Sequence, residues 1–119
     1  MLKNNVLRKE ADFDNVYKRG RSVGDKYVVV FYIKNNRDIN RTCFLASKKV
    51  GNSVRRNRAR RLMRESYRLF KDRLPAGYDV IIIARNTITG RKFSEVDRSI
   101  RRAWPDIVVR NNRKSLQEA

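Results

Sequence analysis

Residues 78–84 read Tyr-Asp-Val-Ile-Ile-Ile-Ala, a nearly continuous apolar run with the length of one β-strand. Such a run is typical of a strand that is buried on both faces. Residues 26–34 form a second strand candidate, because they are β-branched and aromatic throughout. Alternate side chains of this second run give two apolar faces: Tyr27, Val29, Phe31 and Ile33 on one, and Val28, Val30 and Tyr32 on the other. Both runs therefore predict a small sheet packed with helices.

Three other segments have helical patterns. The first is predicted at 10–19 and stops at Gly20, and the third begins near Ser94. The longest is predicted at 54–73, with Ser53 as its N-cap. Its small and apolar stripe at helical spacing consists of Ala59, Leu62, Met63, Ser66, Leu69 and Phe70. These helices would cover the predicted sheet.

The chain is predicted to form one domain over residues 1–119. Residues 41–48 are expected to form a hairpin with the 26–34 strand, through a turn that begins at Asn35. Residues 1–9 and 111–119 are expected to be flexible tails. The fold class is α+β, a small mixed sheet of about four strands packed with three helices.

The composition restricts the possible functions. The chain has 119 residues with 30 Lys plus Arg against 12 Asp plus Glu, a net charge of +18 that suggests a polyanionic partner. Because it has no His and only Cys43, we exclude His-dependent catalytic triads, zinc–thiolate sites and an intramolecular disulfide. No signal peptide is recognisable, and the longest apolar runs are too short to cross a bilayer. We therefore expect a cytoplasmic protein that does not associate with membranes.

Half of the excess positive charge lies in residues 48–73, which hold eleven of the thirty basic residues and only two acidic ones. Four of them recur at every fourth position and form what we call the arginine row: Arg56, Arg60, Arg64 and Arg68. Like charges at this spacing destabilise an isolated helix, whereas the planar guanidinium group binds phosphate with two hydrogen bonds. The pattern therefore favours a nucleic-acid-binding surface over an ordinary solvated helix face.

Residues 46–65 read Ala-Ser-Lys-Lys-Val-Gly-Asn-Ser-Val-Arg-Arg-Asn-Arg-Ala-Arg-Arg-Leu-Met-Arg-Glu. This stretch resembles the signature of bacterial ribonuclease P protein subunits, in which a lysine-rich strand end and a glycine turn precede an Arg-Asn-Arg element. That element is at 56–58 here, where it lies in a basic helix. The resemblance continues at 12–20 and 78–85, so it covers almost the whole chain.

For the fold, the resemblance implies a left-handed βαβ crossover through the basic helix, like that in the second domain of ribosomal protein S5. Sequence patterns alone would favour the usual right-handed connection. For the function, it implies a subunit that binds the catalytic RNA of ribonuclease P and aids removal of the 5′ leader from precursor tRNA. The residues implied to bind the RNA subunit are Lys48, Lys49, Arg56, Asn57, Arg58, Arg60, Arg61, Arg64 and Arg68.

The resemblance also implies a cleft for the single-stranded leader, beside the first helix and one face of the 26–34 strand. Aromatic side chains commonly stack on the bases of single-stranded RNA. The implied leader-binding residues are Phe13, Tyr17, Tyr27, Val29 and Phe31. The alternative is that these side chains belong to the core, as we expect for Val28, Val30, Leu62, Phe70, Ile82 and Trp104.

We expect no catalytic residue and no metal site in this chain. Its candidate carboxylates lie at two predicted helix starts, where acidic residues favour the helix dipole: Glu10, Asp12 and Asp14, then Glu95 and Asp97. In the holoenzyme that the resemblance implies, the RNA subunit and its bound Mg²⁺ perform the hydrolysis, and no further protein partner is required. Two other classes remain open, a ribosomal-type structural RNA-binding protein and a DNA-binding module that uses helix 54–73 for recognition.

Overall fold

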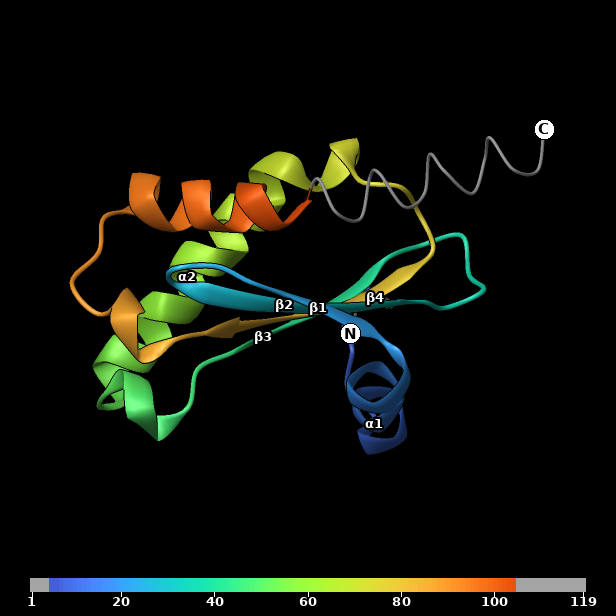
Figure 1. Cartoon of the computed structure of the whole chain (residues 1–119), viewed down its shortest axis with the longest axis horizontal. Coiled ribbons are helices and arrows are strands. Elements are labelled where there is room, and N and C mark those ends of the chain that lie inside the picture. The colour runs from blue at the N-terminus through green and yellow to red at the C-terminus, as the bar shows by residue number, and fades with distance from the viewer. Residues whose placement is uncertain (1–4, 105–119) are drawn as a thin grey trace.

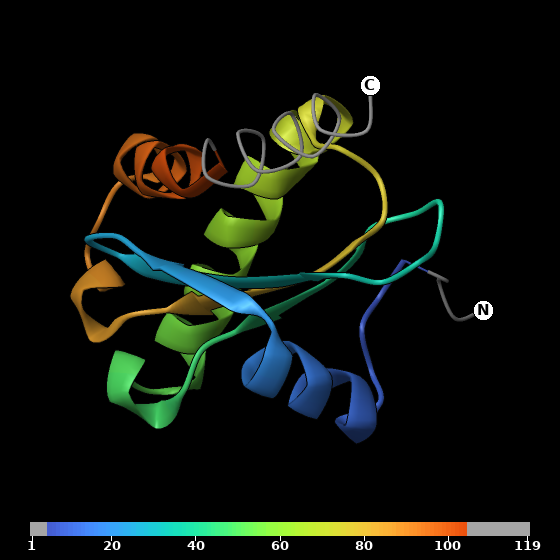
Figure 2. The same ribbon diagram turned by 45° about the vertical axis from the view of Figure 1, so that its right-hand side comes forward.

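The computed structural model of the chain describes residues 5–104. Its elements are α1 (Glu10–Arg19), β1 (Arg21–Gly24), β2 (Val28–Lys34), β3 (Arg41–Leu45), η1 (Lys48–Val50), α2 (Ser53–Phe70), η2 (Lys71–Arg73), β4 (Tyr78–Ala84), η3 (Asn86–Ile88) and a helix at 93–104. The four strands form one mixed sheet in the order β1-β2-β4-β3 (Figure 1). α1 lies on one face of this sheet, and α2 and the 93–104 helix lie on the other (Figure 2). This arrangement is the predicted α+β fold of three helices and four strands.

β4 has an inner position in the sheet because it is apolar on both of its faces. It pairs antiparallel with β2 and parallel with β3. Val80, Ile81 and Ile82 are each at most 1% exposed. The prediction that residues 78–84 form a strand buried on both faces is thus confirmed.

The predicted hairpin between 26–34 and 41–48 is wrong, because β4 lies between β2 and β3. The apolar β4 takes the inner place, and β3, which begins with Arg41, is left at the edge. β1 pairs with the opposite side of β2 and was not foreseen, because it is short and polar.

β3 and β4 are parallel neighbours joined through α2, as the implied βαβ crossover requires. The left-handed sense of this connection stays a prediction. α2 begins at Ser53 and its N-cap is Asn52, not Ser53 as predicted: Asn52 Oδ1 accepts a hydrogen bond of 3.0 Å from the Arg55 amide. Gly51, which precedes the cap, has a φ of 139°, a conformation that favours glycine.

The main core lies between the sheet and the two helices α2 and 93–104. Val28, Val30, Ile82 and Trp104 are fully buried there, as expected. Leu62 and Phe70 are only partly buried and pack against this core. The buried positions of α2 are Ala59, Met63 and Ser66. The prediction that Leu69 belongs to the apolar stripe facing the core is wrong. Leu69 faces away from the sheet and is 51% exposed.

A second core cluster lies on the α1 side, where Leu7, Val16 and Ile81 are buried. Gly20 ends α1 as predicted, and the reason is a close approach of two backbone segments. A Cβ atom at Gly20 would lie 2.4 Å from the Val16 carbonyl oxygen and 2.7 Å from that of Tyr32. Glycine is therefore required to bring α1 against β2.

The prediction of a flexible tail at residues 1–9 is wrong for residues 5–7, which pack against the sheet. Residues 5–7 run beside β3, and Leu7 is 2% exposed. The Leu7 amide donates to the Thr42 carbonyl and the Thr42 amide to the Asn5 carbonyl, both at 2.9 Å. Residues 1–4 and the predicted tail at 111–119 lie outside the described residues. No helix within 5–104 is long and apolar enough to span a bilayer.

Candidate RNA-binding surfaces

The arginine row borders the outer edge of the sheet. Arg56 and Arg60 are half-buried near the start of α2, and Arg64 and Arg68 are exposed further along it. The Arg64 guanidinium carbon lies 5.9 Å from the ring centroid of Phe44, which faces α2 from β3. The row is therefore anchored beside β3 and still presents guanidinium groups to solvent.

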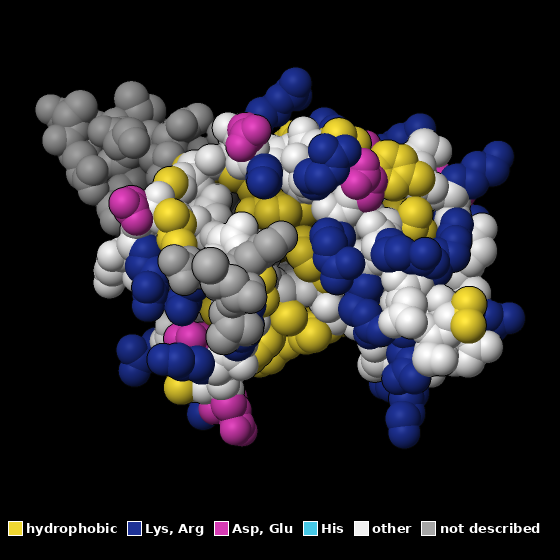
Figure 3. Space-filling model, turned by 180° about the vertical axis from the view of Figure 1, so that it is seen from behind, with side chains coloured by type: hydrophobic (Ala, Val, Ile, Leu, Met, Phe, Trp, Pro, Cys, Tyr) yellow, Lys and Arg dark blue, Asp and Glu magenta, His cyan; other side chains and the backbone are white. Residues whose placement is uncertain are grey.

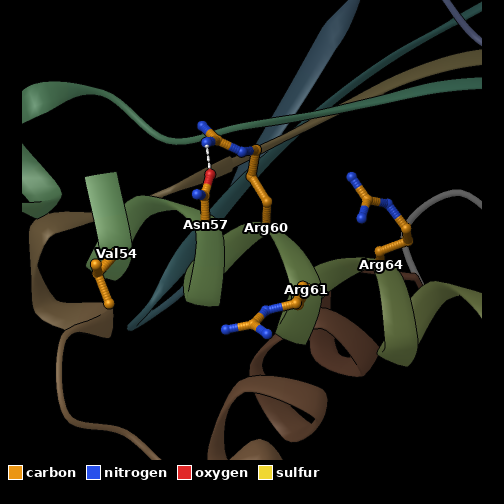
Figure 4. Close-up of a pocket in the computed structure, with 5 residues that line it drawn as sticks. All are labelled: Val54, Asn57, Arg60, Arg61 and Arg64. Atoms are coloured by element: carbon orange, nitrogen blue, oxygen red, sulfur yellow. Dashed lines mark hydrogen bonds between the residues drawn. The ribbon is translucent and has the colours of Figure 1, made fainter. Parts of the chain in front are cut away.

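A shallow hollow of about 480 Å³ opens over the first turns of α2 (Figure 4). It is lined by Val54, Asn57, Arg60, Arg61 and Arg64. Asn57 Oδ1 accepts a hydrogen bond from Arg60 Nη2, which orients both side chains. Three guanidinium groups surround this hollow and no carboxylate lines it, so that it suits phosphate groups. Sequence reasoning missed Val54, an apolar side chain that is 71% exposed within this basic surface.

Both predicted lysines precede α2, and the side chain of one predicted arginine is already hydrogen-bonded within the chain. Lys48 and Lys49 lie in η1 with exposed side chains, and the Lys49 amide donates to Ser47 Oγ at 3.3 Å. Arg58 Nη2 instead donates to the carbonyl of Arg91 at 2.9 Å. Arg58 therefore links α2 to the loop before the 93–104 helix.

The far end of the arginine row is partly neutralised within the chain. Arg68 donates two hydrogen bonds to Glu65, from Nε to Oε2 at 3.0 Å and from Nη2 to Oε1 at 2.7 Å. These bonds lower the pKa of Glu65 and raise that of Arg68. A phosphate that binds at Arg68 must compete with a carboxylate, whereas Arg60 and Arg61 line a hollow without one.

The opposite face of the sheet is only partly covered by α1. Val29 is paired with Ile83 on this face, and Phe31 with Ile81. Phe31, Leu45 and Ile83 are partly buried against the α1-side core. Figure 3 shows a hollow strip of hydrophobic side chains with Lys and Arg side chains along one of its borders.

Four of the five predicted leader-binding residues come together on this α1-side face. The Tyr17 ring meets the Phe31 ring edge to face, with 5.1 Å between centroids. Tyr17 is 42% exposed, and partial burial raises the pKa of its hydroxyl. Phe13 is partly buried in the same cluster and Val29 is half-buried on β2. These side chains thus contribute to the core and also offer apolar surface.

Tyr27 lies apart from these four residues, contrary to the predicted alternation. β2 begins only at Val28, because the chain turns just before it with a hydrogen bond from the Asp25 amide to the Val28 carbonyl. The Tyr27 ring packs against the core on the α2 side, with the Arg91 guanidinium carbon 5.4 Å from its centroid. Its hydroxyl donates to Glu95 at 3.5 Å. The structure therefore places Tyr27 beside the 93–104 helix.

Three of the five candidate carboxylates make contacts within the fold. Asp12 forms an ion pair with Arg41 at 3.3 Å. Glu95 accepts a hydrogen bond from the Lys92 amide, which lowers its pKa, and Asp97 accepts one of 2.7 Å from Ser66. Within residues 5–104, no three His, Cys, Asp or Glu side chains lie close enough together to hold a metal ion.

Sequence reasoning also missed a buried polar network that ties α1 to the sheet. Asp79 in β4 is 2% exposed and accepts hydrogen bonds from Arg41 and from Asn35 Nδ2. Arg41 in turn reaches Asp12 on α1. The sequence does indicate such a contact, because Asp79 interrupts the apolar run 78–84 and a buried carboxylate needs a hydrogen-bonding or charged partner.

Comparisons with known proteins agree on one family. The family model described as Ribonuclease P matches residues 1–108. The ribonuclease P protein component of Alkaliphilus oremlandii is 43% identical over 96 residues, which cover 81% of this chain and 84% of that protein. The solved ribonuclease P protein of Staphylococcus aureus superposes with a TM-score of 0.78 at 32% identity, covering 85% of this chain and 93% of that one. The Thermotoga maritima protein gives a TM-score of 0.73 at 31% identity, covering 80% and 90%.

Proposed function

Because this chain belongs to the ribonuclease P protein family, we propose that it binds two different parts of the enzyme's RNA on two faces. Ribonuclease P is an endoribonuclease that acts as a ribonucleoprotein in tRNA 5′ processing, and this chain is its RNA-binding protein subunit. Family membership favours this role over the ribosomal-type and DNA-binding alternatives. The proposal concerns which RNA each surface binds.

The first part of the proposal is that the basic surface of η1 and α2 binds the catalytic RNA subunit. The observation that carries it is the hollow lined by Asn57, Arg60, Arg61 and Arg64, which contains no carboxylate. Guanidinium groups can bind phosphates in pairs of hydrogen bonds, and folded RNA presents closely spaced phosphates. Lys48 and Lys49 extend the same surface at the start of the helix.

The second part is that the α1-side face binds the 5′ leader of precursor tRNA. Phe13, Tyr17, Val29 and Phe31 offer partly exposed apolar surface, with an exposed Tyr17 ring at its border. Unpaired bases stack on such aromatic surface without a strong sequence preference. Tyr27 has no part in this proposal, since it lies beside the 93–104 helix.

The third part concerns the chemistry. Asp12 and Asp97 make contacts within the fold, and within residues 5–104 no cluster of potential metal ligands is formed. We therefore assign the hydrolysis and its Mg²⁺ to the RNA subunit, and to this chain the binding and screening of phosphates. On this proposal the protein acts in the cytoplasm, where precursor tRNA is processed, and needs no further protein partner.

Reconstitution with the ribonuclease P RNA tests this function. Single-turnover cleavage of precursor tRNA is measured at low Mg²⁺ with the RNA alone, with the RNA and this protein, and with the RNA and polylysine of equal total charge. We expect this protein to accelerate cleavage more than polylysine does, because it adds leader contacts to charge screening. Equal rates with and without the protein would refute the proposal.

A further inference from the structure

A second cavity, of about 420 Å³, lies at the outer edge of β3 below the second half of α2. We call it the β3-edge pocket, and its lining consists of Asn5, Val6, Thr42, Cys43, Phe44, Arg64, Tyr67, Arg68 and Lys71. Its volume falls within the usual range of ligand sites, roughly 300 to 1,000 Å³. It is distinct from the hollow at the start of α2, and the two share only Arg64.

The pocket has an aromatic wall that the core holds in place. The rings of Phe44 and Tyr67 pack edge to face with 5.7 Å between their centroids. Tyr67 packs in turn on the buried Trp104 at 6.2 Å. Because both rings are partly buried, their positions are set before any ligand binds.

The rim of the pocket is basic. Arg64 and Arg68 lie on α2 and Lys71 follows at the start of η2, and all three are exposed pocket residues. Glu65 neutralises Arg68, so that Arg64 and Lys71 supply the net positive charge. The Arg64 guanidinium lies over the Phe44 ring, and a planar ligand could pack beside this pair.

Within residues 5–104, the outer edge of β3 has no backbone partner beyond Thr42. Residues 5–7 pair with the strand only around Thr42 and then leave it to enter α1. Among residues 5–104, no further backbone pair is formed on this edge. The backbone of Phe44 therefore borders the pocket, next to the aromatic wall.

We propose that the β3-edge pocket binds one unpaired nucleotide of the RNA subunit, with its base against Phe44 and Tyr67 and its phosphate between Arg64 and Lys71. The inference rests on the proposed function, because it assumes that α2 faces the RNA subunit. A nucleotide fits both features of the pocket, since it carries a planar apolar face and a negative charge. An apolar peptide would leave the basic rim unused.

Photocrosslinking of the reconstituted holoenzyme tests the proposal. The RNA subunit is transcribed with part of its uridine replaced by 4-thiouridine, assembled with the full chain, irradiated and digested with trypsin. We expect crosslinked nucleotides on two tryptic peptides, residues 42–48, which contain Phe44, and residues 65–68, which contain Tyr67. Absence of crosslinks on both peptides in a complex that cleaves precursor tRNA would overturn the pocket and leave the proposed function intact. A mixture that neither assembles nor cleaves would refute both.

Two matched pairs of variants separate the pocket from general effects. Phe44→Leu keeps an apolar side chain but removes the ring, and should weaken RNA-subunit binding about fivefold or more and abolish the 65–68 crosslink. Phe70→Leu removes a ring that stacks on Trp104 outside the pocket. It should change neither the affinity for the RNA subunit nor the 65–68 crosslink. Lys71→Gln should weaken binding more than Arg73→Gln, although both remove one exposed charge from η2. Equal effects within either pair would overturn the proposal.

Discussion

The guanidinium group of Arg41 binds the carboxylate of Asp79 with two hydrogen bonds, from Nε to Oδ1 at 2.8 Å and from Nη2 to Oδ2 at 2.6 Å. Arg41 begins the edge strand β3 and Asp79 lies in the inner strand β4, so that the pair fixes the register of the parallel strands. The same guanidinium reaches Asp12 at 3.3 Å, which connects α1 to both strands. The hydrogen bonds that Arg41 donates to Asp79 raise the pKa of Arg41.

Removing one partner of this buried pair is expected to be costly. Asp79→Asn leaves the largely buried Arg41 without its main counter-charge, and should lower the free energy of unfolding by about 3 kcal/mol. Asp12→Asn is the matched control: Asp12 is more exposed and Arg41 keeps Asp79, so we expect less than about 1 kcal/mol. Urea unfolding measures both variants. A loss for Asp12→Asn as large as that for Asp79→Asn would contradict this assignment.

Gly20→Ala should disturb the docking of α1 on the sheet. The added Cβ would meet two backbone carbonyl oxygens, which cannot rotate away as a side chain can. We expect a loss of about 1–3 kcal/mol in the free energy of unfolding, together with weaker binding of leader-containing precursor tRNA. Gly24→Ala is the control, because its nearest neighbour is an Arg85 side-chain atom at 3.9 Å and a change within about 0.5 kcal/mol is expected. Similar losses for both glycines would argue against the close approach as the cause.

Arg60→Ala should weaken assembly with the RNA subunit and make it less dependent on salt. Each phosphate contact that is lost lowers the slope of log affinity against log salt concentration by about one unit. Filter binding over a salt series gives this slope. Arg37→Ala removes the same charge from the 35–40 loop, at the opposite end of the sheet from the start of α2, and should leave the slope unchanged (Figure 1). An equal change in both slopes would mean that net charge alone determines the affinity.

Phe31→Leu should selectively weaken precursor tRNAs with long leaders. The substitution keeps an apolar side chain in β2 but removes the ring against which Tyr17 packs. Loss of one stacked base costs about 1–3 kcal/mol, so affinity for a long-leader precursor should fall about fivefold or more. Binding of mature tRNA, measured in the same assay, should not change. A parallel loss for mature tRNA would show that Phe31 supports the fold and not the leader.

The carboxylate of Asp25 should make stability depend on pH. It accepts hydrogen bonds from Arg102 at 2.6 and 2.8 Å and from Ser99 at 2.7 Å, and those from Arg102 above all hold the pKa of Asp25 well below its usual value. A lowered pKa in the folded state stabilises the fold above the unfolded pKa of about 3.9, and this contribution is lost as the pH falls toward the folded pKa.

Asp25→Asn should therefore lower the free energy of unfolding near neutral pH by no more than about 1 kcal/mol, because Arg102 is 41% exposed and solvent screens the pair. The difference from the unchanged protein should narrow below about pH 4. Urea unfolding at several pH values measures this difference in the free energy of unfolding. A difference that is constant from neutral to acid pH would show that the ionisation of Asp25 is not the cause.

Local pattern was sufficient for the helices, for the inner strand and for the basic surface. The helix at 10–19, the inner strand at 78–84 and the basic helix after Gly51 agree with the structure, because each depends on residues close in the chain. The charge density of residues 48–73 was enough to indicate a nucleic-acid partner. Periodicity and charge are local properties, and the sequence displays them directly.

The neighbours of each element in the folded chain could not be predicted from local pattern. The position of β4 between β2 and β3, the displacement of Tyr27 to the 93–104 helix and the Arg41–Asp79 pair all join residues that are far apart in the chain. Strand order depends on which apolar faces compete for the inner position, and that competition involves the whole sheet at once. The pocket below α2 likewise exists only because the fold brings Phe44 beneath Arg64 and Tyr67.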